Sequence, residues 1–251
     1  MGDAGTQDRP TYLIIGAAGG IGSALVRRLA TRGARMLLAG RREEPIRELA
    51  DEIGAEAMVA DATDYDAVEA LCTRAVEMTD RLDGVANLAG SIVLKPAHLT
   101  TRDEVDEAIA QNLHTAFATV RAGAQAMKRA GGSIVLMSSC AGQVGLPNHD
   151  LIGAAKAAVS GLTRSAAATY APSGVRVNAV APGLVDTPMA ERLTSNDAAL
   201  KASKSMHPLG RIGAPDEVAP VIDWLLGPES EWVTGQVVGV DGGISTVKAR
   251  A

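Results

Sequence analysis

The chain is poor in aromatic residues: its 251 residues include two tryptophans, three tyrosines and one phenylalanine. So few rings leave no platform on which nucleic-acid bases could stack. The formal net charge is −5, and no block of basic residues interrupts the sequence. Both features are untypical of nucleic-acid-binding proteins. We therefore expect no nucleic-acid partner.

Cysteines and long apolar runs are also scarce. The two cysteines, Cys72 and Cys140, suit a reducing compartment, and neither a C-x-x-C pair nor a zinc-type spacing occurs. Hydrophobic residues make up 47% of the chain, but none of their runs is long enough to cross a bilayer. The first ten residues form a polar tail without a secretory-type apolar segment. We expect a cytoplasmic protein with no membrane association and no metal site.

Short apolar runs alternate with segments of helical periodicity along residues 11–251. Strands are expected at residues 12–15, 34–39, 57–60, 84–88, 133–137, 175–180 and 236–240, and helices at residues 23–31, 44–53, 64–79, 102–130 (one or two), 151–170 and 217–226. This alternation predicts an α/β fold, a single doubly wound Rossmann-type domain whose seven-stranded parallel sheet carries helices on both faces. Polar residues 187–209 interrupt the pattern after the sixth strand, where a substrate lid would lie.

A glycine-rich turn joins the first strand to the first helix. The sequence G-A-A-G-G-I-G at residues 16–22 places Gly16, Gly20 and Gly22 around Ile21. Glycines allow a tight turn and let backbone amides approach a pyrophosphate, which also benefits from the helix N-terminus. Such turns often serve packing alone, but the strand–turn–helix context favours nucleotide binding.

The second strand ends in Gly40-Arg41-Arg42. A carboxylate here would bind the adenosine ribose of NAD, and Gly40 supplies none. Arg41 can instead pair with a 2′-phosphate, which favours NADP(H) over NAD(H); the alternative is a solvated arginine pair. Asp61, just after the third strand, can accept a hydrogen bond from the adenine amino group or can cap the following helix.

Together these features resemble the short-chain dehydrogenase/reductase family over residues 11–246. The family's T-G-x-x-x-G-x-G appears as I-G-A-A-G-G-I-G, its N-N-A-G as N-L-A-G at residues 87–90, and its P-G motif as A-P-G-L-V-D-T-P-M at residues 181–189. The resemblance implies an oxidoreductase that binds a nicotinamide dinucleotide. It assigns further cofactor contacts to these residues: Asn87, Gly90, Lys156, Pro182, Gly183, Val185 and Thr187.

The resemblance also assigns catalytic roles. Ser139 would hydrogen-bond the substrate, Asn112 would hold a water molecule in the proton path, and Lys156 would hold the nicotinamide ribose. The family's Y-x-x-x-K is here Ile152-Gly-Ala-Ala-Lys156, so an aliphatic side chain replaces the usual proton donor. Tyr170, eighteen residues further along the same helix, would be about 27 Å away.

His149, three residues before Ile152, is a candidate replacement acid. The unperturbed pKa of histidine, about 6.5, suits proton transfer, and Asp150 can raise it. The alternative is a loop histidine beside an aspartate that caps the helix. His98, His114 and His207 are expected at the surface or in a pocket wall, and Cys140 is expected to be a small buried hydrophobe.

Three functions fit these residues. The first is an NADP(H)-dependent oxidoreductase that transfers hydride to or from a small carbonyl or imine by a non-standard proton route. The second is a catalytically inactive dinucleotide-binding homologue with a regulatory or structural role, and the third is a non-redox lyase or isomerase. The family resemblance implies a homo-oligomer, usually a tetramer, with the helices near residues 112–130 and 151–170 at one interface.

Overall fold

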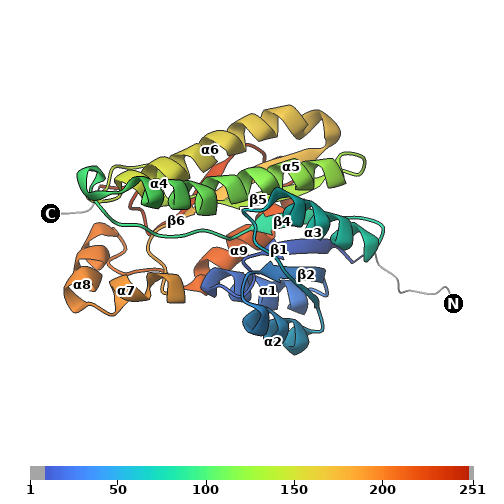
Figure 1. The fold of residues 1–251 in the computed structure, drawn as a ribbon, viewed down its shortest axis with the longest axis horizontal. Coiled ribbons are helices and arrows are strands. Elements are labelled where there is room, and N and C mark those ends of the chain that lie inside the picture. The colour runs from blue at the N-terminus through green and yellow to red at the C-terminus, as the bar shows by residue number, and fades with distance from the viewer. Residues whose placement is uncertain (1–8, 249–251) are drawn as a thin grey trace.

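Seven parallel strands form the central sheet of the computed structural model, which describes residues 9–248 (Figure 1). The strand order is β3-β2-β1-β4-β5-β6-β7. The strands are β1 (Thr11–Ile15), β2 (Arg35–Gly40), β3 (Glu56–Val59), β4 (Gly84–Asn87), β5 (Gly132–Met137), β6 (Val175–Pro182) and β7 (Val237–Val240). The predicted doubly wound parallel sheet is confirmed. The order reverses between β1 and β4, and ligands bind at such a point, outside the carboxyl ends of the strands.

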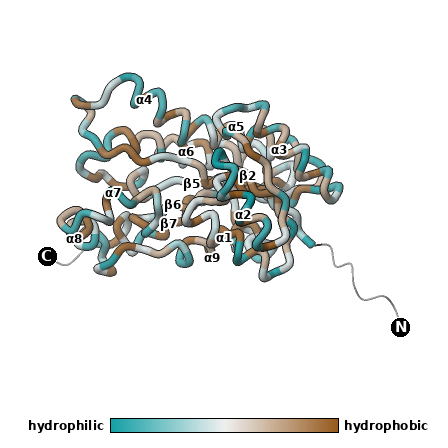
Figure 2. Tube along the Cα trace, turned by 60° about the horizontal axis from the view of Figure 1, so that its bottom comes forward, coloured by the Kyte–Doolittle hydropathy of each residue, from teal (hydrophilic) through white to brown (hydrophobic). Residues whose placement is uncertain are grey.

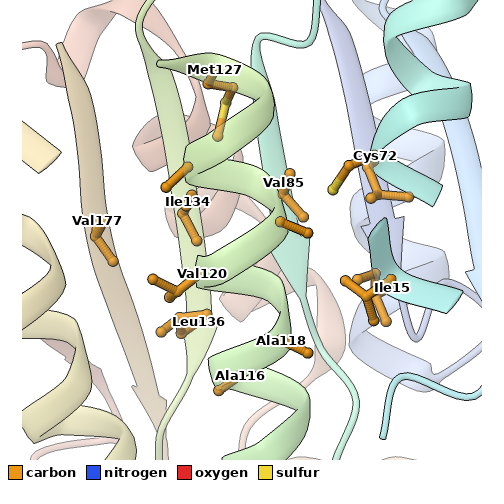
Figure 3. Close-up of a cluster of buried hydrophobic side chains, with 14 of the residues drawn as sticks. Ile15, Cys72, Val85, Ala116, Ala118, Val120, Met127, Ile134, Leu136 and Val177 are labelled. Carbon is orange, nitrogen blue, oxygen red and sulfur yellow. The ribbon is translucent and has the colours of Figure 1, made fainter. Parts of the chain in front are cut away.

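Helices cover both faces of the sheet, as Figure 1 shows. One layer contains α1 (Gly20–Thr31), α2 (Glu43–Ile53) and α9 (Pro215–Leu226), and the other contains α3 (Tyr65–Glu77), α4 (Arg102–Ile109), α5 (Thr115–Met127) and α6 (Asp150–Tyr170). The strands alternate their side chains between two buried clusters: Leu13 and Ile15 pack beneath α3 and α5, whereas Tyr12 and Ile14 pack against α1 and α9. Figure 3 shows the first cluster, and Figure 2 shows hydrophobic residues gathered along the central strands.

A π-helical turn, Ala110–His114, joins α4 to α5. The sequence left open whether residues 102–130 form one helix or two, and the structure has two with this turn between them. A capping box of Thr101 and Glu104 starts α4. The π-turn lies at the carboxyl end of the sheet and turns the buried Asn112 towards the loop that follows β4.

The polar segment after β6 folds into the short helices α7 (Glu191–Thr194) and α8 (Asp197–Met206), preceded by a 3₁₀ turn, Pro188–Ala190. In Figure 1 these orange helices lie beside the sheet, beyond the end of β6. The chain leaves the sheet through Val185 and returns through Gly213, and these two residues form an isolated parallel bridge. The two ends of this segment therefore lie side by side, and its role as a substrate lid stays a prediction.

Other expectations fall partly outside the described residues. The polar tail was predicted for residues 1–10, of which 1–8 lie outside the described part of the chain, as do 249–251. Within residues 9–248, no helix combines the length and the apolar character that crossing a membrane would need. The same residues contain no cluster of three or more His, Cys, Asp or Glu side chains suited to a metal ion.

Candidate active site

The glycine turn after β1 is a close-packed cradle in which side chains have no room. Gly16 has a positive φ of +81°, and a Cβ there would lie 2.9 Å from the Ala89 amide nitrogen. A Cβ at Gly20 would lie 2.6 Å from the Thr187 Cγ2 atom, and one at Gly22 would collide with the Gly16 carbonyl oxygen. Helix α1 begins at Gly20, so its free N–H groups face the space that these glycines leave. The cradle therefore fits a pyrophosphate.

A cavity of about 440 Å³ runs from this cradle across the carboxyl ends of β4, β5 and β6. Its walls include Ser139, Ile152 and Lys156. They also include these residues of the predicted cofactor set: Gly16, Gly20, Ile21, Gly22, Gly90, Pro182, Gly183, Val185 and Thr187. Segments far apart in the sequence thus converge on one cavity that many of the predicted site residues line.

A second cavity of about 230 Å³ continues the first one beyond the glycine turn, and Gly16, Gly19 and Gly90 line both. Arg41, Arg42 and Asp61 lie around it. The Asp61 carboxylate accepts hydrogen bonds from the Thr63 backbone N–H, at 2.9 Å, and hydroxyl, at 2.8 Å. The first of these bonds is the main reason why the pKa of Asp61 is lowered. Asp61 does not cap the next helix, because Asp64 does.

Arg42 is a cavity residue that the sequence reasoning missed. Only Arg41 was assigned to the nucleotide, yet Arg42 lines both cavities, and its Nη2 atom donates to the Ala18 carbonyl oxygen at 3.3 Å. This contact holds the guanidinium over the glycine turn. The doubled arginine after the second strand was the available signal, because both side chains start at the carboxyl end of that strand, where the nucleotide was expected.

Lys156 is buried in the wall of the larger cavity. Its Nζ atom donates to the Met137 carbonyl oxygen at 2.8 Å, and a Cβ at Gly90 would lie 3.3 Å from it. Burial lowers the pKa of Lys156 to about 8, because the charged ammonium loses hydration there. Lys156 is therefore a cationic donor that can also release a proton near neutral pH.

Ile152 stands one helical turn before Lys156 on the same face of α6 and lines the same cavity. Its side chain is buried and offers no polar atom. Nearby, the Ser139 hydroxyl accepts from the Ala141 amide at 3.2 Å and makes only a long contact, 3.5 Å, with the Pro182 carbonyl oxygen. The Ser139 proton thus remains available to a ligand in the cavity.

Two predicted site residues serve the walls rather than the cavity. The Asn87 amide donates to the Thr119 hydroxyl at 3.0 Å and accepts from the Ala89 amide at 3.0 Å, which shapes the turn after β4. The Asn112 side chain donates to Ser91 Oγ at 3.1 Å and accepts from the Ser91 amide at 3.2 Å. Neither residue lines the two cavities, so their predicted contacts with cofactor or water remain predictions.

The loop before α6 differs from expectation. Asp150 was a candidate N-cap, but it is the first residue of α6, and its carboxylate accepts from the Ala97 amide at 2.8 Å in the loop after β4. His149 occupies the N-cap position, and its Nδ1 atom bonds the Pro147 carbonyl oxygen at 2.7 Å. His149 lies outside the residues that line the two cavities. The expectation of an Asp150 cap is therefore wrong, because that carboxylate ties two loops together.

Cys140 and His207 are both buried. Burial raises the pKa of the Cys140 thiol to about 11, as expected of a small hydrophobic side chain rather than a reactive one. His207 bonds to the Ser203 carbonyl oxygen and to the Leu184 amide. It lies in the wall of another cavity, which the loops after β6, α8 and β7 line together with the start of α9.

Comparisons with known proteins agree with this geometry. Residues 16–245 match the family model described as enoyl-(acyl carrier protein) reductase. The chain is 38% identical to a 3-oxoacyl-(acyl-carrier-protein) reductase of Thermotoga maritima, covering 92% of this chain and 96% of the relative. It is also 38% identical to the cis-4-hydroxycyclohexanecarboxylate dehydrogenase of Sinomonas cyclohexanicum, covering 94% and 96%.

Solved structures give the same answer. Levodione reductase is 33% identical, with a TM-score of 0.90 over 95% of this chain and 98% of that one. An actinorhodin polyketide ketoreductase variant solved with NADPH is 29% identical, with a TM-score of 0.89 over 96% and 99%. The chain belongs to the short-chain dehydrogenase/reductase family, whose members bind a nicotinamide dinucleotide, and these relatives identify it as a short-chain oxidoreductase.

Proposed function

We propose that the chain is an NADP(H)-dependent reductase of small carbonyl or imine compounds, in which Lys156 rather than the residue at position 152 supplies the proton. One observation carries the proposal. Among the described residues that line the larger cavity, Arg42 and Lys156 have titratable side chains, and a guanidinium does not release its proton near neutral pH. Lys156, with a pKa lowered to about 8, does.

The family resemblance puts Ile152 where the usual tyrosine acid stands. General acid catalysis typically contributes about 10²–10⁴-fold to a rate, whereas correct orientation of hydride donor and acceptor is worth effective molarities of about 10⁵–10⁸ M. Loss of the phenol therefore slows the reaction without abolishing it. An iminium substrate needs no proton at the hydride step, so this class tolerates an isoleucine best.

The proton balance of carbonyl reduction is simple. A dinucleotide held by the glycine turn and Lys156 would supply the hydride to the carbonyl carbon. The Lys156 ammonium gives one proton to the carbonyl oxygen, either directly or through a water molecule, and the neutral amine regains a proton from solvent. Ser139 donates a hydrogen bond to the same oxygen. His149 is the less favoured acid, because it lies outside the cavity lining.

Charge at the adenosine end supports the preference for NADP(H). Arg41 and Arg42 line the smaller cavity there. Gly40 offers no carboxylate to a 2′-hydroxyl, and Asp61 already accepts two bonds from Thr63. Guanidinium groups bind phosphate through several parallel hydrogen bonds. A 2′-phosphate would complete this end of the site.

The substrate side is mainly apolar. Ile92, Ile152, Leu184 and Met189 line it together with the hydroxyls of Ser91 and Ser139. These walls favour a small substrate with an apolar body and one hydrogen-bond-accepting atom.

We further propose a cytoplasmic homo-oligomer, with a tetramer as the family resemblance implies. Phe117 supports an oligomer because it lies on α5, a helix that the resemblance puts at an interface, and its apolar ring is about half exposed. The ring stacks on Tyr65 of the same chain, with 6.3 Å between the centroids. Light scattering of the purified protein tests the assembly, and a monomer at micromolar concentration would contradict it.

Single-turnover oxidation of NADPH across a panel of carbonyls and imines tests the function. We expect reduction that is fastest below the Lys156 pKa of about 8 and falls tenfold per pH unit above it, because the acid must be protonated. Lys156→Arg keeps a cation for the ribose, but its pKa above about 12 prevents proton release. This variant should bind NADPH, react slowly and show no such break in its pH profile.

The other outcomes separate the alternatives. An unchanged profile in Lys156→Arg would remove Lys156 as the acid, and loss of the break in His149→Gln would assign the acid to His149. Tight NADPH binding without consumption across the panel would instead favour an inactive dinucleotide-binding homologue, the reading that the buried, apolar Ile152 supports.

A further inference from the structure

The predicted lid has a fixed base. The chain leaves β6 through Gly183 and Leu184, forms α7 and α8, whose C-cap is His207, and returns to the sheet at Gly213. At the base, the Gly213 amide donates to the Leu184 carbonyl oxygen at 2.9 Å, and the Asp186 amide donates to the Gly213 carbonyl oxygen at 2.9 Å. Gly183 and Leu184 also form part of the wall of the dinucleotide cavity. The base of the lid and that wall are thus the same stretch of backbone.

The His207 ring joins this stretch to the last turn of α8. Its Nε2 atom lies 3.2 Å from the Leu184 amide nitrogen, and its Nδ1 atom lies 2.7 Å from the Ser203 carbonyl oxygen. An amide is only a donor and a carbonyl only an acceptor. Nε2 must therefore carry a lone pair and Nδ1 a hydrogen, so a neutral ring in one tautomer satisfies both bonds.

Packing leaves the ring no alternative position. It is 4% exposed, and a Cβ at Gly183 would lie 2.5 Å from Nε2. On the other side, a Cβ at Gly242, in the loop after β7, would lie 3.5 Å from the His207 Cδ2 atom. The ring is thus wedged between the loops that follow β6 and β7.

We propose that His207 is a positioning residue for the dinucleotide site: its neutral ring fixes the backbone of Gly183 and Leu184, and thereby one cavity wall, to the end of the lid helix α8. A hydrogen on Nε2 would face the Leu184 N–H group, so the tie requires the neutral ring with its hydrogen on Nδ1. The inference requires that a dinucleotide binds in this cavity, but it is independent of the proton route proposed above.

The charged groups near the His207 ring either have other hydrogen-bond partners or are exposed to solvent. Arg211 and Glu217 line the same cavity as His207 and pair with each other at 2.5 Å. Asp241, after β7, accepts from the Gly243 amide at 2.8 Å and from Ser245. Lys204 on α8 and Asp186 in the loop after β6 are exposed to solvent. The carboxylates of Glu217 and Asp241 thus have other partners, and the ring bonds two backbone groups.

Hydrogen exchange tests the tie without any turnover. His207→Leu removes the acceptor, whereas His207→Gln keeps a neutral acceptor that does not titrate, and His98→Gln alters an exposed histidine as the matched control. At neutral pH we expect peptides covering residues 183–190 and 196–213 to exchange about tenfold faster in the leucine variant, with little change in the other two. Unchanged exchange in the leucine variant, or a uniform increase that includes β5, would overturn the proposal.

The affinity for NADP⁺ is the second measurement. We expect His207→Leu to weaken binding about tenfold at neutral pH and His207→Gln to restore it to within about twofold of wild type. Equal affinities of the wild-type protein and His207→Leu, or a loss in His207→Leu that His207→Gln does not restore, would contradict the proposal.

Discussion

The two ends of the sheet are built differently. At the amino end, charged and hydroxyl groups are paired: the buried Asp223 carboxylate accepts from Arg28 at 2.7 Å and Arg32 at 2.8 Å, and the Thr11 amide donates to Asp83 at 2.7 Å. At the carboxyl end, the glycine cradle leaves space, and Lys156 bonds only one backbone carbonyl that the structure records. The amino end therefore contributes stability, and the carboxyl end leaves groups free for ligands.

Of the changes at the carboxyl end, a tyrosine at position 152 should have the largest effect, which is on the rate of carbonyl reduction. Ile152→Tyr places a phenol beside Lys156 and Ser139, and we expect carbonyl reduction to rise by up to about 10²–10⁴-fold, because a phenol at this position takes over the proton donation that we propose for Lys156. Ile152→Phe is the matched control, because it adds the ring without the hydroxyl. Single-turnover rates with NADPH measure both variants, and equal rates in the two would show that the phenol oxygen finds no productive position.

A methyl group in the glycine turn should have the second-largest effect, which is on dinucleotide affinity. Gly22→Ala puts a methyl group into the Gly16 and Ala17 carbonyl oxygens, which belong to rigid backbone. We expect dinucleotide affinity to fall about 100-fold, because the turn must open before the pyrophosphate can approach. Titration by fluorescence measures the loss. Gly145→Ala is the control, since nothing lies within 4 Å of its Cβ, and it should bind normally.

Substitutions at the amino end of the sheet should lower the free energy of unfolding and leave NADPH affinity unchanged. Asp223→Asn removes the charge that holds Arg28 and Arg32, and we expect about 2 kcal/mol of destabilisation, tempered by the solvent that reaches both arginines. The melting temperature should fall by about 5 °C. Glu52→Gln, which breaks the exposed Arg27–Glu52 pair, should change it far less. A loss of NADPH affinity in Asp223→Asn at a temperature where it is folded would contradict the separation of the two ends.

The same contrast explains what the sequence could predict. Glycine spacing and strand–helix alternation are local and periodic, so the sheet and the cradle follow from them, whereas the family resemblance assigned Ser139, Ile152 and Lys156 to the site. Side-chain partners across distant segments leave no such trace. Nothing local shows that Asp150 reaches Ala97, that Asn112 is engaged by Ser91, or that His207 bonds Leu184 from 23 residues away. These contacts arise only when loops converge at the carboxyl end.

The adenosine end should show the smallest effect, because its arginines are largely exposed to water. Arg41→Asp exchanges a cation for a carboxylate beside the smaller cavity, and we expect the affinity ratio of NADPH to NADH to fall about tenfold. Arg42 should retain part of the preference, since its bond to Ala18 fixes it over the same cavity. Arg47→Asp provides a matched charge change on the exposed face of α2, where Arg47 pairs with Glu43, and should leave the ratio unchanged. If both variants shift the ratio equally, the preference reflects the overall charge of this region. If Arg41→Asp alone shifts it, and by a factor that shrinks with added salt, the 2′-phosphate is bound by a specific but solvent-screened arginine.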